Sequence, residues 1–504
     1  MADEPNEFDV VVLGAGAVGE NVADRASRTG LSVVVVEPAL VGGECSYWAC
    51  MPSKALLRPG DALAAVRAVP GAASAVTGDL DVAEVLAHRD DVAAHWDDAG
   101  QVAWVEGAGL TLLRGAARFT APRTLAVRRA DGSEVIVTAR RAVVVATGSV
   151  PVVPEALTGV RAWTSREATS AHRVPARLAV VGGGVVAAEM ATAFADLGSD
   201  VTVLVRGERL LPAAEPFAGQ AVARHLVDRG VRVAFGASVT AATRDDDGVH
   251  LVVERTSVGD GRRAEVAPER VTVDEVLVAT GRRPATDDLG LEVLGLRAGD
   301  PLRVDDALQV LEVDGGWLFA AGDVTGRTAT THQGKYDARV VGDVVAARFD
   351  PRPAGAPDGD GVPSGLSRDA EASAAPWSRY RATADVAAVP QVVFTRPQVA
   401  WVGRTQAQAR RDGIDVRVIG YELGDLAAAS VTGTGYTGRA QIVVDVARDV
   451  VVGATFVGPD VADMLHAATV AVVGEVPLAR LWHAVPSYPT LSEVWLRLLE
   501  AAGR

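Results

Sequence analysis

Continuous apolar runs, rather than alternating ones, mark the first predicted strands. Residues 10–13 (Val-Val-Val-Leu) have the pattern of a strand buried on both faces, as in a parallel sheet. A glycine-rich turn and an Ala/Arg-rich helix follow, and residues 31–36 predict a second strand that ends on Glu37. The same order returns from 177 to 206, with strands at 178–181 and 201–205. The pattern predicts an α/β fold with two Rossmann-like half-units and therefore two dinucleotide sites.

Three further strand ends and a change of composition organise the rest of the chain. Residues 143–148 and 276–281 both end in Val-Ala-Thr-Gly, and residues 318–323 read as a buried strand with an acidic tip, followed by a helix near 332–347. Residues 350–384 are rich in Pro, Gly, Ala, Ser and Asp without apolar periodicity, which predicts a flexible linker or surface insertion. From residue 389 strands and helices alternate again, ending on an amphipathic helix over 493–501.

The first glycine motif, Gly14-x-Gly16-x-x-Gly19, stands between the first strand and its helix. The first glycine allows the tight turn, the second lets a pyrophosphate approach the backbone, and the third lets helix and strand pack closely. Glu37, at the end of the second strand, is placed to accept a hydrogen bond from a ribose hydroxyl. These features together predict a dinucleotide site.

The second motif, Gly182-x-Gly184-x-x-Ala187, ends in alanine, and its second strand has no acidic tip. Arg206 stands there, with Arg209 close behind. An acid would repel a 2′-phosphate, whereas a guanidinium binds it in a fork. We therefore expect NADPH, with NADH as the alternative; the other interpretation of Arg206 is a solvated surface charge.

Charge and cysteine usage narrow the function. The net charge of −15 argues against nucleic acid and anionic membranes as partners. No apolar stretch is long enough to span a bilayer, and no signal peptide precedes the first strand, so we expect a cytoplasmic protein. The chain has only two cysteines, Cys45 and Cys50. Two ligands cannot complete a structural zinc site, and a reducing cytosol does not maintain structural disulfides, so redox chemistry is favoured and no metal site is expected.

The segment 42–54, Gly-Gly-Glu-Cys-Ser-Tyr-Trp-Ala-Cys-Met-Pro-Ser-Lys, resembles that of FAD-dependent pyridine nucleotide-disulfide oxidoreductases. This is the group of dihydrolipoamide dehydrogenase, glutathione reductase and mercuric reductase. The resemblance covers nearly the whole chain, and the order of its motifs is very specific to the family. The other motifs are both glycine turns, both Ala-Thr-Gly strand ends, Ala321-Gly322-Asp323, Phe394-Thr395-Arg396-Pro397 and Pro489-Thr490-Leu491-Ser492-Glu493.

The resemblance implies a homodimeric flavoenzyme with two Rossmann-like domains and a C-terminal α+β dimerisation domain. The expected boundaries are an FAD-binding domain at 1–155, an NAD(P)H-binding domain at 156–285, a central part completing the FAD domain at 286–349, the linker at 350–385 and the dimerisation domain at 386–504. The cofactors it implies are FAD and a nicotinamide nucleotide.

The resemblance also implies roles for individual residues. Cys50 would be the charge-transfer thiolate beside the flavin, and Cys45 the interchange thiol facing the substrate. Lys54 and Glu189 match the family's ion pair near flavin N5. Lys54 is one of two lysines among 49 Lys and Arg residues, which suggests a need for a compact ammonium, with chance survival as the alternative. Asp323 would hold the ribityl chain, the helix after it would aim its N-terminus at the flavin, and Thr147 and Gly148 would line the FAD site.

The chain departs from the family at the C-terminal motif His-Pro-Thr-x-x-Glu. Tyr488 takes the place of the histidine, while Glu493 is retained, and both would reach the partner's site in a dimer. A phenol with a pKa near ~10 is a poor proton shuttle at neutral pH. His483 would substitute if its loop bends inward; the alternative is a surface or interface histidine. Fast turnover of glutathione disulfide or lipoamide is therefore not expected.

Two further departures concern the acceptor. A tyrosine here is similar to mercuric reductase, yet the chain has no third cysteine with which to relay mercury inward. Tyr47 and Trp48 stand where the family has small or polar residues, and they either narrow the thiol site, stack against an aromatic acceptor or simply pack.

Several functions follow from these features. The first hypothesis is an NADPH-dependent reductase of a non-standard disulfide or other thiol-reactive electrophile, a small molecule. The alternative is a quinone or dye reductase in which electrons leave directly from the flavin. Mercuric ion reduction, dithiol oxidation and a non-catalytic redox sensor are further readings.

Overall fold

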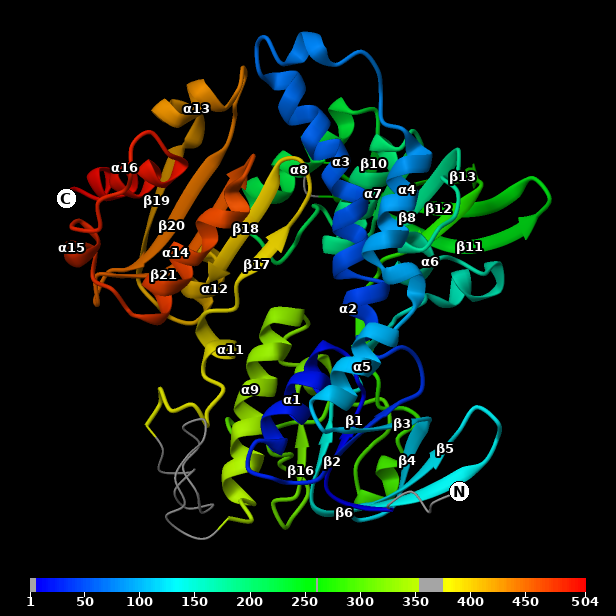
Figure 1. Cartoon of the computed structure of the whole chain (residues 1–504). Coiled ribbons are helices and arrows are strands. Elements are labelled where there is room, and N and C mark those ends of the chain that lie inside the picture. The colour runs from blue at the N-terminus through cyan, green and yellow to red at the C-terminus, as the bar shows by residue number, and fades with distance from the viewer. Residues whose placement is uncertain (1–5, 260–261, 353–374) are drawn as a thin grey trace. The chain divides into compact units, whose positions relative to one another are not determined.

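The structure is a computed structural model that describes residues 6–259, 262–352 and 375–504 (Figure 1). The chain forms two compact units, each made of three segments. The first contains Met1–Met51, Ala93–Val150 and Arg282–Asp385, and the second contains Pro52–Val92, Pro151–Gly281 and Val386–Arg504. Most of the predicted linker, residues 353–374, lies outside the described residues.

The first unit is built on a sheet with the strand order β3-β2-β1-β6-β5-β4, and β16 pairs with β6. Its central strands β1, β2, β6 and β16 run parallel, with Val11 opposite both Val34 and Val143. Where they pair with each other, these strands are buried on both faces, as their continuous apolar runs predict. Their bounds are β1 Glu7–Leu13, β2 Val33–Glu37, β3 Thr111–Arg114, β4 Ala116–Ala121, β5 Thr124–Arg128, β6 Glu134–Val145 and β16 Leu318–Ala320.

Two helices pack against each other and against this sheet: α1 (Ala17–Ser27) and α9 (Thr331–Arg348). Small residues bring them close, since a Cβ on Gly342 would lie 2.6 Å from Cβ of Arg25. Arg25 Nε donates to Asp343 Oδ1 across the pair at 2.7 Å. The unit also contains α2 (Gly43–Tyr47), α5 (Ala99–Gly107), β15 (Arg282–Pro284) and the first two residues of β7 (Ser149–Pro151).

The last residues of the predicted linker are packed. Tyr380 and Ala382 are buried in the core formed with α9, and Arg379 Nε donates to Asp343 Oδ2 at 2.8 Å. The prediction of a flexible segment therefore does not hold for this end, because Tyr380 is buried and Arg379 forms an ion pair with the buried Asp343.

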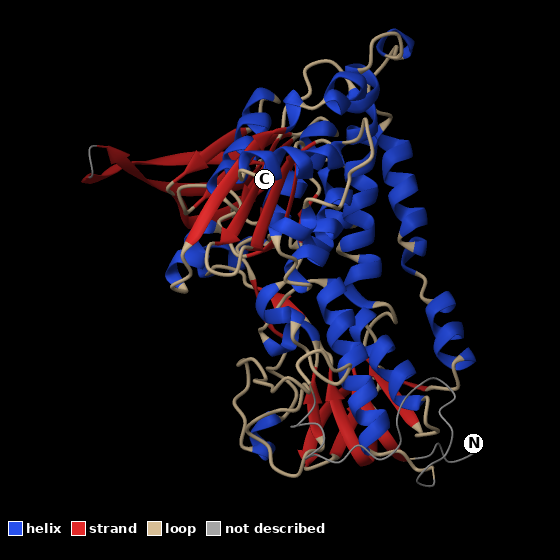
Figure 2. Cartoon of the chain, turned by 90° about the vertical axis from the view of Figure 1, so that its left-hand side faces the viewer, coloured by secondary structure: helices blue, strands red, loops and turns tan. Residues whose placement is uncertain are grey.

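The second unit contains the other parallel sheet, in the order β10-β9-β8-β14. Its strands are β8 Arg177–Val181, β9 Asp200–Val205, β10 Arg232–Phe235 and β14 Glu275–Val278, with the helices α7 Val185–Asp196 and α8 Pro216–Asp228. The antiparallel strands β11 Ala237–Asp245, β12 Gly248–Gly259 and β13 Arg262–Val273 form a second sheet with a long β12–β13 hairpin (Figure 2). The two parallel sheets confirm the predicted pair of Rossmann-like domains.

The C-terminal part of this unit is an antiparallel sheet, β17-β18-β21-β20-β19, with helices around a core of its own. The predicted terminal helix is confirmed as α16, beginning one residue later than expected. The bounds are β17 Gln391–Val393, β18 Gln398–Gly403, β19 Val416–Glu422, β20 Arg439–Asp445, β21 Val450–Gly458, α12 Gln406–Arg411, α13 Ala427–Thr432, α14 Leu465–Val473, α15 Leu478–Leu481 and α16 Val494–Ala501. The unit also contains α4 Val82–Val92, α6 Ser165–Thr169 and all but the first two residues of α3 Cys50–Ala68.

Candidate active site

The first glycine turn has the geometry of a nucleotide cradle. Gly14 has φ +99°, and a Cβ on Gly19 would lie 1.8 Å from the Gly14 carbonyl oxygen. Gly16 caps α1 without a side-chain hydrogen bond, so the first N–H groups of the helix keep their capacity to bind a pyrophosphate. Glu37 is buried at the strand tip and accepts from the N–H groups of Ala15 and Ala39, each at 2.8 Å. These residues fit a dinucleotide such as FAD.

Polar residues at neighbouring strand ends form a connected chain in the first unit. Ser149 Oγ donates to Asp323 Oδ2 at 2.6 Å, and Arg282 Nε donates to Ser149 Oγ at 2.8 Å. Arg282 also lies 3.5 Å from Glu44, beside Cys45. Just before Ser149, Thr147 Oγ1 donates to the carbonyl of Ala285 at 2.9 Å, and Gly148 has φ +73°. Arg282 and Ser149 were not predicted as site residues, although each directly follows an Ala-Thr-Gly strand end.

The two cysteines are held by α2 and by the first residue of α3. Gly43 fixes this segment against the glycine turn, since a Cβ there would lie 2.7 Å from Cα of Gly16. Both cysteines are half-buried thiols. A hydrogen bond from Cys45 to Cys50, together with burial, raises the pKa of the Cys45 thiol. When the pair carries one negative charge, this arrangement places the remaining proton on Cys45.

The N-terminus of α9 lies beside the cysteine pair. The Sγ atom of Cys50 is 3.2 Å from Oγ1 of Thr331, the first residue of α9. Thr330 caps the helix without a side-chain hydrogen bond, and its buried hydroxyl has no partner among the described residues. A helix N-terminus stabilises negative charge, so this position favours a thiolate at Cys50. The predicted helix at 332–347 is confirmed, but sequence reading missed Thr331.

The aromatic residues between the cysteines differ in exposure. Tyr47 is buried, its hydroxyl has no partner among the described residues, and burial with the nearby acids Asp98, Glu20 and Asp97 raises the pKa of Tyr47 to about 12. The half-buried Trp48 lies with its ring centroid 5.7 Å from that of Tyr47. Trp96 Nε1 donates to the backbone carbonyl of Tyr47 at 3.1 Å. For Tyr47 this is a packing role, and Trp48 is the more accessible of the two rings.

The second unit contains the other glycine turn. A Cβ on Gly182 would lie 2.2 Å from the carbonyl oxygen of Ala279, and Gly184 begins α7 without a side-chain cap. Ala187 is fully buried where the helix packs on its sheet. Arg206 is exposed directly after β9, while Arg209 is half-buried and donates to the carbonyl of Pro212 at 2.8 Å. The geometry fits a nucleotide, with Arg206 as the more available guanidinium.

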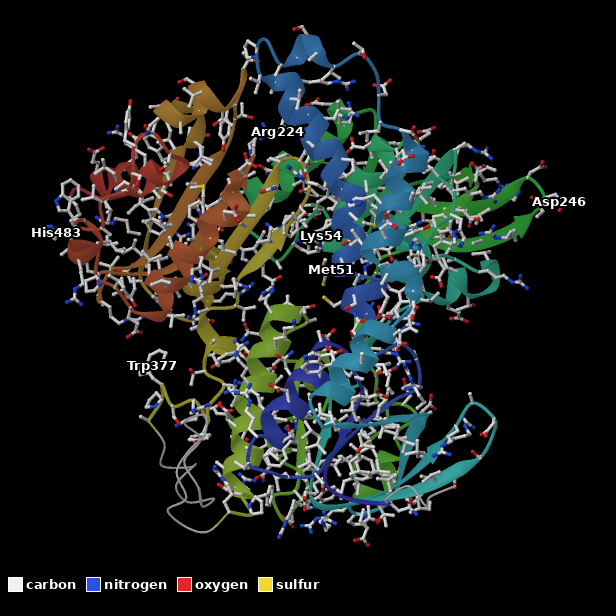
Figure 3. The ribbon with its side chains drawn as sticks, in the orientation of Figure 1. Met51, Lys54, Arg224, Asp246, Trp377 and His483 are labelled. Atoms are coloured by element: carbon white, nitrogen blue, oxygen red, sulfur yellow. The ribbon has the colours of Figure 1, made fainter. Side chains whose placement is uncertain are left out.

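Lys54 and Glu189, predicted as a pair, are in contact in the second unit. Lys54 Nζ lies 2.8 Å from Glu189 Oε2, and the Phe394 N–H donates to the other carboxylate oxygen at 3.0 Å. The ammonium is 4.9 Å from the ring centroid of Phe394. Figure 3 shows Lys54 on α3. Its side chain is half-buried, whereas that of Glu189 is buried. Phe394 was not predicted as a site residue, although it begins the Phe-Thr-Arg-Pro motif that is part of the family resemblance.

The C-terminal residues lie on the surface of the last domain. Tyr488 is 75% exposed, and His483 is exposed at the edge of this domain (Figure 3). Glu493 is buried, with Oε1 accepting from Arg497 at 2.6 Å and Oε2 without a partner among the described residues. Trp482 and Val485, earlier in the same segment, are also exposed. The apolar surface of this segment suits an interface.

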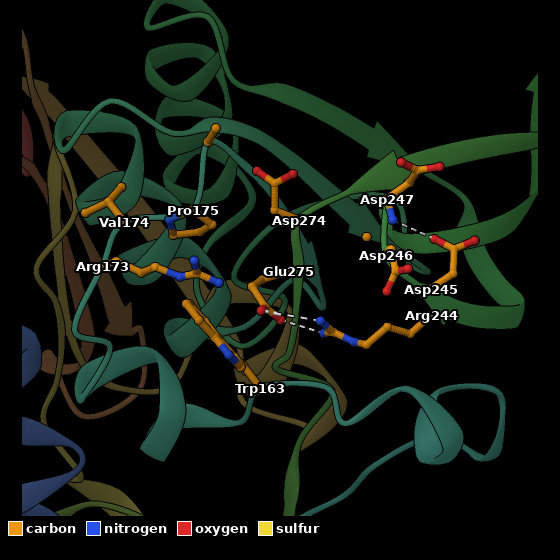
Figure 4. A pocket seen from close by; sticks show the side chains of 12 residues that line it. Trp163, Arg173, Val174, Pro175, Arg244, Asp245, Asp246, Asp247, Asp274 and Glu275 are labelled. Atoms are coloured by element: carbon orange, nitrogen blue, oxygen red, sulfur yellow. Dashed lines mark hydrogen bonds and ion pairs between the residues drawn. The ribbon is translucent and has the colours of Figure 1, made fainter.

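A cavity of about 360 Å³ occurs elsewhere in the second unit (Figure 4). It is lined by Trp163 and by charged groups that include Asp245, Asp246 and the ion pair between Arg244 and Glu275 at 2.6 Å. No predicted site residue lines this cavity. Acidic residues outnumber arginines in its lining, so the cavity has a net negative charge.

Comparison with known proteins decides the family. Residues 8–338 match the family model described as pyridine nucleotide-disulphide oxidoreductase, and residues 389–499 match its dimerisation domain. The chain belongs to the pyridine nucleotide-disulphide oxidoreductase family. The family confirms the expected oxidoreductase and the use of FAD with a nicotinamide nucleotide, and the dimerisation domain supports a homodimer.

Its relatives have different reactions in their names. The chain is 28% identical to the mercuric reductase of Staphylococcus aureus, covering 97% of this chain and 81% of that one. It is also 28% identical to the dihydrolipoyl dehydrogenase of Thermus scotoductus, covering 98% and 97%. The copper(II) complex of the HOCl-induced flavoprotein disulfide reductase RclA from Escherichia coli shares the fold, with a TM-score of 0.77, 23% identity and coverage of 98% and 99%. Among the described residues no helix is both long and apolar enough to cross a bilayer.

Proposed function

We propose that this oxidoreductase is an NADPH-dependent flavoenzyme that reduces a non-standard disulfide or another thiol-reactive electrophile through Cys45 and Cys50. The observation that carries the proposal is the hydrogen-bonded thiol pair, whose Cys50 sulfur lies 3.2 Å from the first side chain of α9. The helix N-terminus favours charge on Cys50, while Cys45 keeps the proton and loses it when it exchanges with a substrate.

The residues of the chain divide the work. The first glycine turn would hold the pyrophosphate and the adenosine ribose of FAD, through Gly14, Gly16, Gly19 and Glu37. Asp323 would hold the ribityl chain. When bound, FAD supplies a two-electron carrier between the nicotinamide and the cysteine pair. Lys54 and Glu189 would hold fixed charges beside it, and the glycine turn at Gly182 would hold the nicotinamide nucleotide.

NADPH is the proposed donor because Arg206 stands exposed at the tip of β9, where a carboxylate would otherwise meet a free ribose hydroxyl. A 2′-phosphate would give this guanidinium an anionic partner, with Arg209 nearby. The ratio of kcat/KM for NADPH and NADH tests this assignment, and a preference for NADH would contradict it.

Tyr488 restricts the acceptor. Without an imidazole at this position, the leaving thiolate of a disulfide would depart without a nearby acid, and thiols of low pKa leave fastest under that condition. We therefore expect aromatic disulfides to be reduced much faster than glutathione disulfide. Equal rates for 5,5′-dithiobis(2-nitrobenzoate) and glutathione disulfide would contradict this expectation.

The homodimer would complete each site with Tyr488 and Glu493 from the second copy. The side chains of Trp482, Val485 and Tyr488 support this proposal, since these large apolar and aromatic groups are exposed within one short segment of the dimerisation domain. Sedimentation should give a particle of twice the chain mass of 52.1 kDa. A monomer that retained full activity would refute the shared site.

The decisive experiment replaces each cysteine separately. Cys45→Ser should abolish NADPH-driven reduction of disulfides, while bleaching of the flavin absorbance by NADPH should persist. Ser46→Ala, a neighbouring half-buried position, is the matched control and should keep activity. Full disulfide reductase activity in Cys45→Ser would end the proposal.

The second candidate is a quinone or dye reductase in which electrons leave directly from the flavin. The half-buried Trp48 favours it, because its ring could stack against an aromatic acceptor. Under this hypothesis Cys50→Ser retains quinone turnover. Loss of quinone turnover in that variant would exclude the second candidate and leave the thiol route.

A further inference from the structure

The second lysine of the chain, Lys335, is not among the residues of the proposed function. Lysine occurs only at positions 54 and 335. Lys335 lies on α9 four residues after Thr331, and residues with this spacing share one face of a helix. Because Thr331 Oγ1 lies 3.2 Å from Cys50 Sγ, this face of α9 is the one next to the cysteine pair. Lys335 therefore belongs to the surroundings of the redox thiols.

The charge of Lys335 acts on Cys45. Its ammonium lowers the pKa of the Cys45 thiol, in opposition to the Cys50 hydrogen bond and burial, which raise that pKa. Lys335 is half-buried, and it forms no ion pair with any residue that the structure describes. Its field is therefore not cancelled by a carboxylate in direct contact.

A carboxyl group on α1 responds to the same ammonium. α9 packs tightly on α1 at this level, since a Cβ on Gly334 would lie 2.6 Å from Cγ2 of Val18. Glu20 follows two residues later, and its buried Oε1 has no hydrogen-bond partner among the described residues. Burial raises the pKa of Glu20 to about 7, Lys335 opposes the shift, and Glu37 adds to it.

We propose that Lys335 is a positioning residue for the thiol step, whose ammonium stabilises negative charge on Cys45 while Glu20 acts as its titrating counter-ion. The proposal rests on the proposed function and deepens it. A lysine on α9 would then supply a positive charge to a site in which position 488 is not a histidine. Tyr47, another titratable group near Glu20, stays protonated because its pKa is about 12.

The step balances as a thiol–disulfide exchange. Cys45 gives its proton to water, and its sulfur forms a bond to one sulfur of the acceptor disulfide as the acceptor's S–S bond breaks. The first thiolate leaves and takes a proton from water. The Cys50 thiolate then attacks the Cys45 sulfur, which closes the Cys45–Cys50 disulfide and releases the second thiolate. Two electrons pass from the cysteine pair to the acceptor, and Lys335 neither gives nor takes a proton in this balance.

The test measures the alkylation of Cys45 by iodoacetamide in the dithiothreitol-reduced holoenzyme as a function of pH. Peptide mass spectrometry separates labelling of Cys45 from labelling of Cys50. Lys335→Met should slow labelling of Cys45 at pH ~7 by about tenfold, since loss of one nearby charge raises a pKa by about one unit. Lys335→Arg keeps the charge and should stay within about threefold of the wild type. Arg339→Met, an exposed cation one turn further along α9, is the matched control and should change nothing.

Glu20→Gln should have the opposite effect. Without the counter-ion, the ammonium acts more strongly on Cys45, so labelling should become faster at neutral pH and the profile should lose the inflection near pH 7 that Glu20 causes. An unchanged profile in Lys335→Met, or a shift of both variants in the same direction, would overturn the proposal. If Lys335→Met fails to retain FAD, Glu20→Gln decides alone, and slower or unchanged labelling in it would refute the role of Lys335.

This outcome is independent of turnover, because no acceptor is present during labelling. Persistent disulfide reduction by Cys45→Ser would defeat the proposed function yet leave the labelling result intact. An unchanged labelling profile would defeat the role of Lys335 while the cysteine route stands.

Discussion

The ion pair between Lys54 and Glu189 gives the sharpest quantitative prediction. Its atoms are 2.8 Å apart, and the Glu189 side chain is 4% exposed while that of Lys54 is 36% exposed. Replacing Lys54 with methionine keeps the aliphatic stem against Phe394 and removes only the charge. The buried carboxylate would then retain the Phe394 N–H as its hydrogen-bond donor.

The magnitude follows from two opposing contributions. At a separation of 2.8 Å and an effective dielectric constant of about 20, the attraction of the two charges is about 6 kcal/mol. Solvent at the half-exposed ammonium and the desolvation of Glu189 offset most of this attraction. We expect Lys54→Met to destabilise the second unit by about 2 kcal/mol, because a buried carboxylate loses its cation. This change corresponds to about 4 °C in the unfolding temperature of a domain of this size.

The assay is a double-mutant cycle on the thermal unfolding of the holoenzyme at fixed FAD concentration. Lys54→Met should lose about 4 °C, whereas adding Glu189→Gln to it should cost little more, because the carboxylate that lacked a partner is gone. Lys54→Arg, which keeps the charge, is the control and should lose less than half as much. Additive losses in the double variant would refute the reasoning, since they would show that the two groups do not stabilise each other.

Three further predictions concern backbone, cofactor and pH. Gly43→Ala should lower the FAD retained after gel filtration, because its Cβ would lie 2.7 Å from Cα of Gly16; Gly100→Ala, with open space around it, should retain FAD fully. Arg206→Glu should raise the KM for NADPH about tenfold and leave that for NADH unchanged, and equal effects on both would contradict the phosphate contact. Glu20→Gln should become progressively more stable than the wild type from pH 4.5 to pH 7, by up to about 3 kcal/mol, in urea unfolding. Between the unfolded pKa of 4.5 and the folded pKa of about 7, the Glu20 carboxyl stays protonated in the folded state but ionises in the unfolded state. The wild type therefore loses stability as the pH rises through this window. A constant stability difference between the two proteins across this window would contradict the prediction.

The sequence predicted those features that depend on local backbone geometry. The glycine turns were readable because only glycine fits positions such as Gly14, with φ +99°, and Gly19, where a Cβ would lie 1.8 Å from a carbonyl oxygen. The strands were readable because their apolar runs are continuous. Lys54 and Glu189 are 135 residues apart, and their pairing came from the family resemblance rather than from any local pattern.

The surroundings of the cysteines were beyond prediction for a physical reason. Thr331 and Lys335 approach the pair only because α9 packs on α1, and the sequence separation from Cys50 to Thr331 is 281 residues. A threonine at a helix start and a glutamate in a first turn are ordinary helix residues, so neither carries a signature of redox chemistry. What distinguishes Glu20 is the burial of its carboxyl group, and burial is a property of the packed helices. The residues proposed to bind the two nucleotides are thus recognisable from local motifs. The positive charge that lowers the pKa of Cys45 comes from tertiary packing instead.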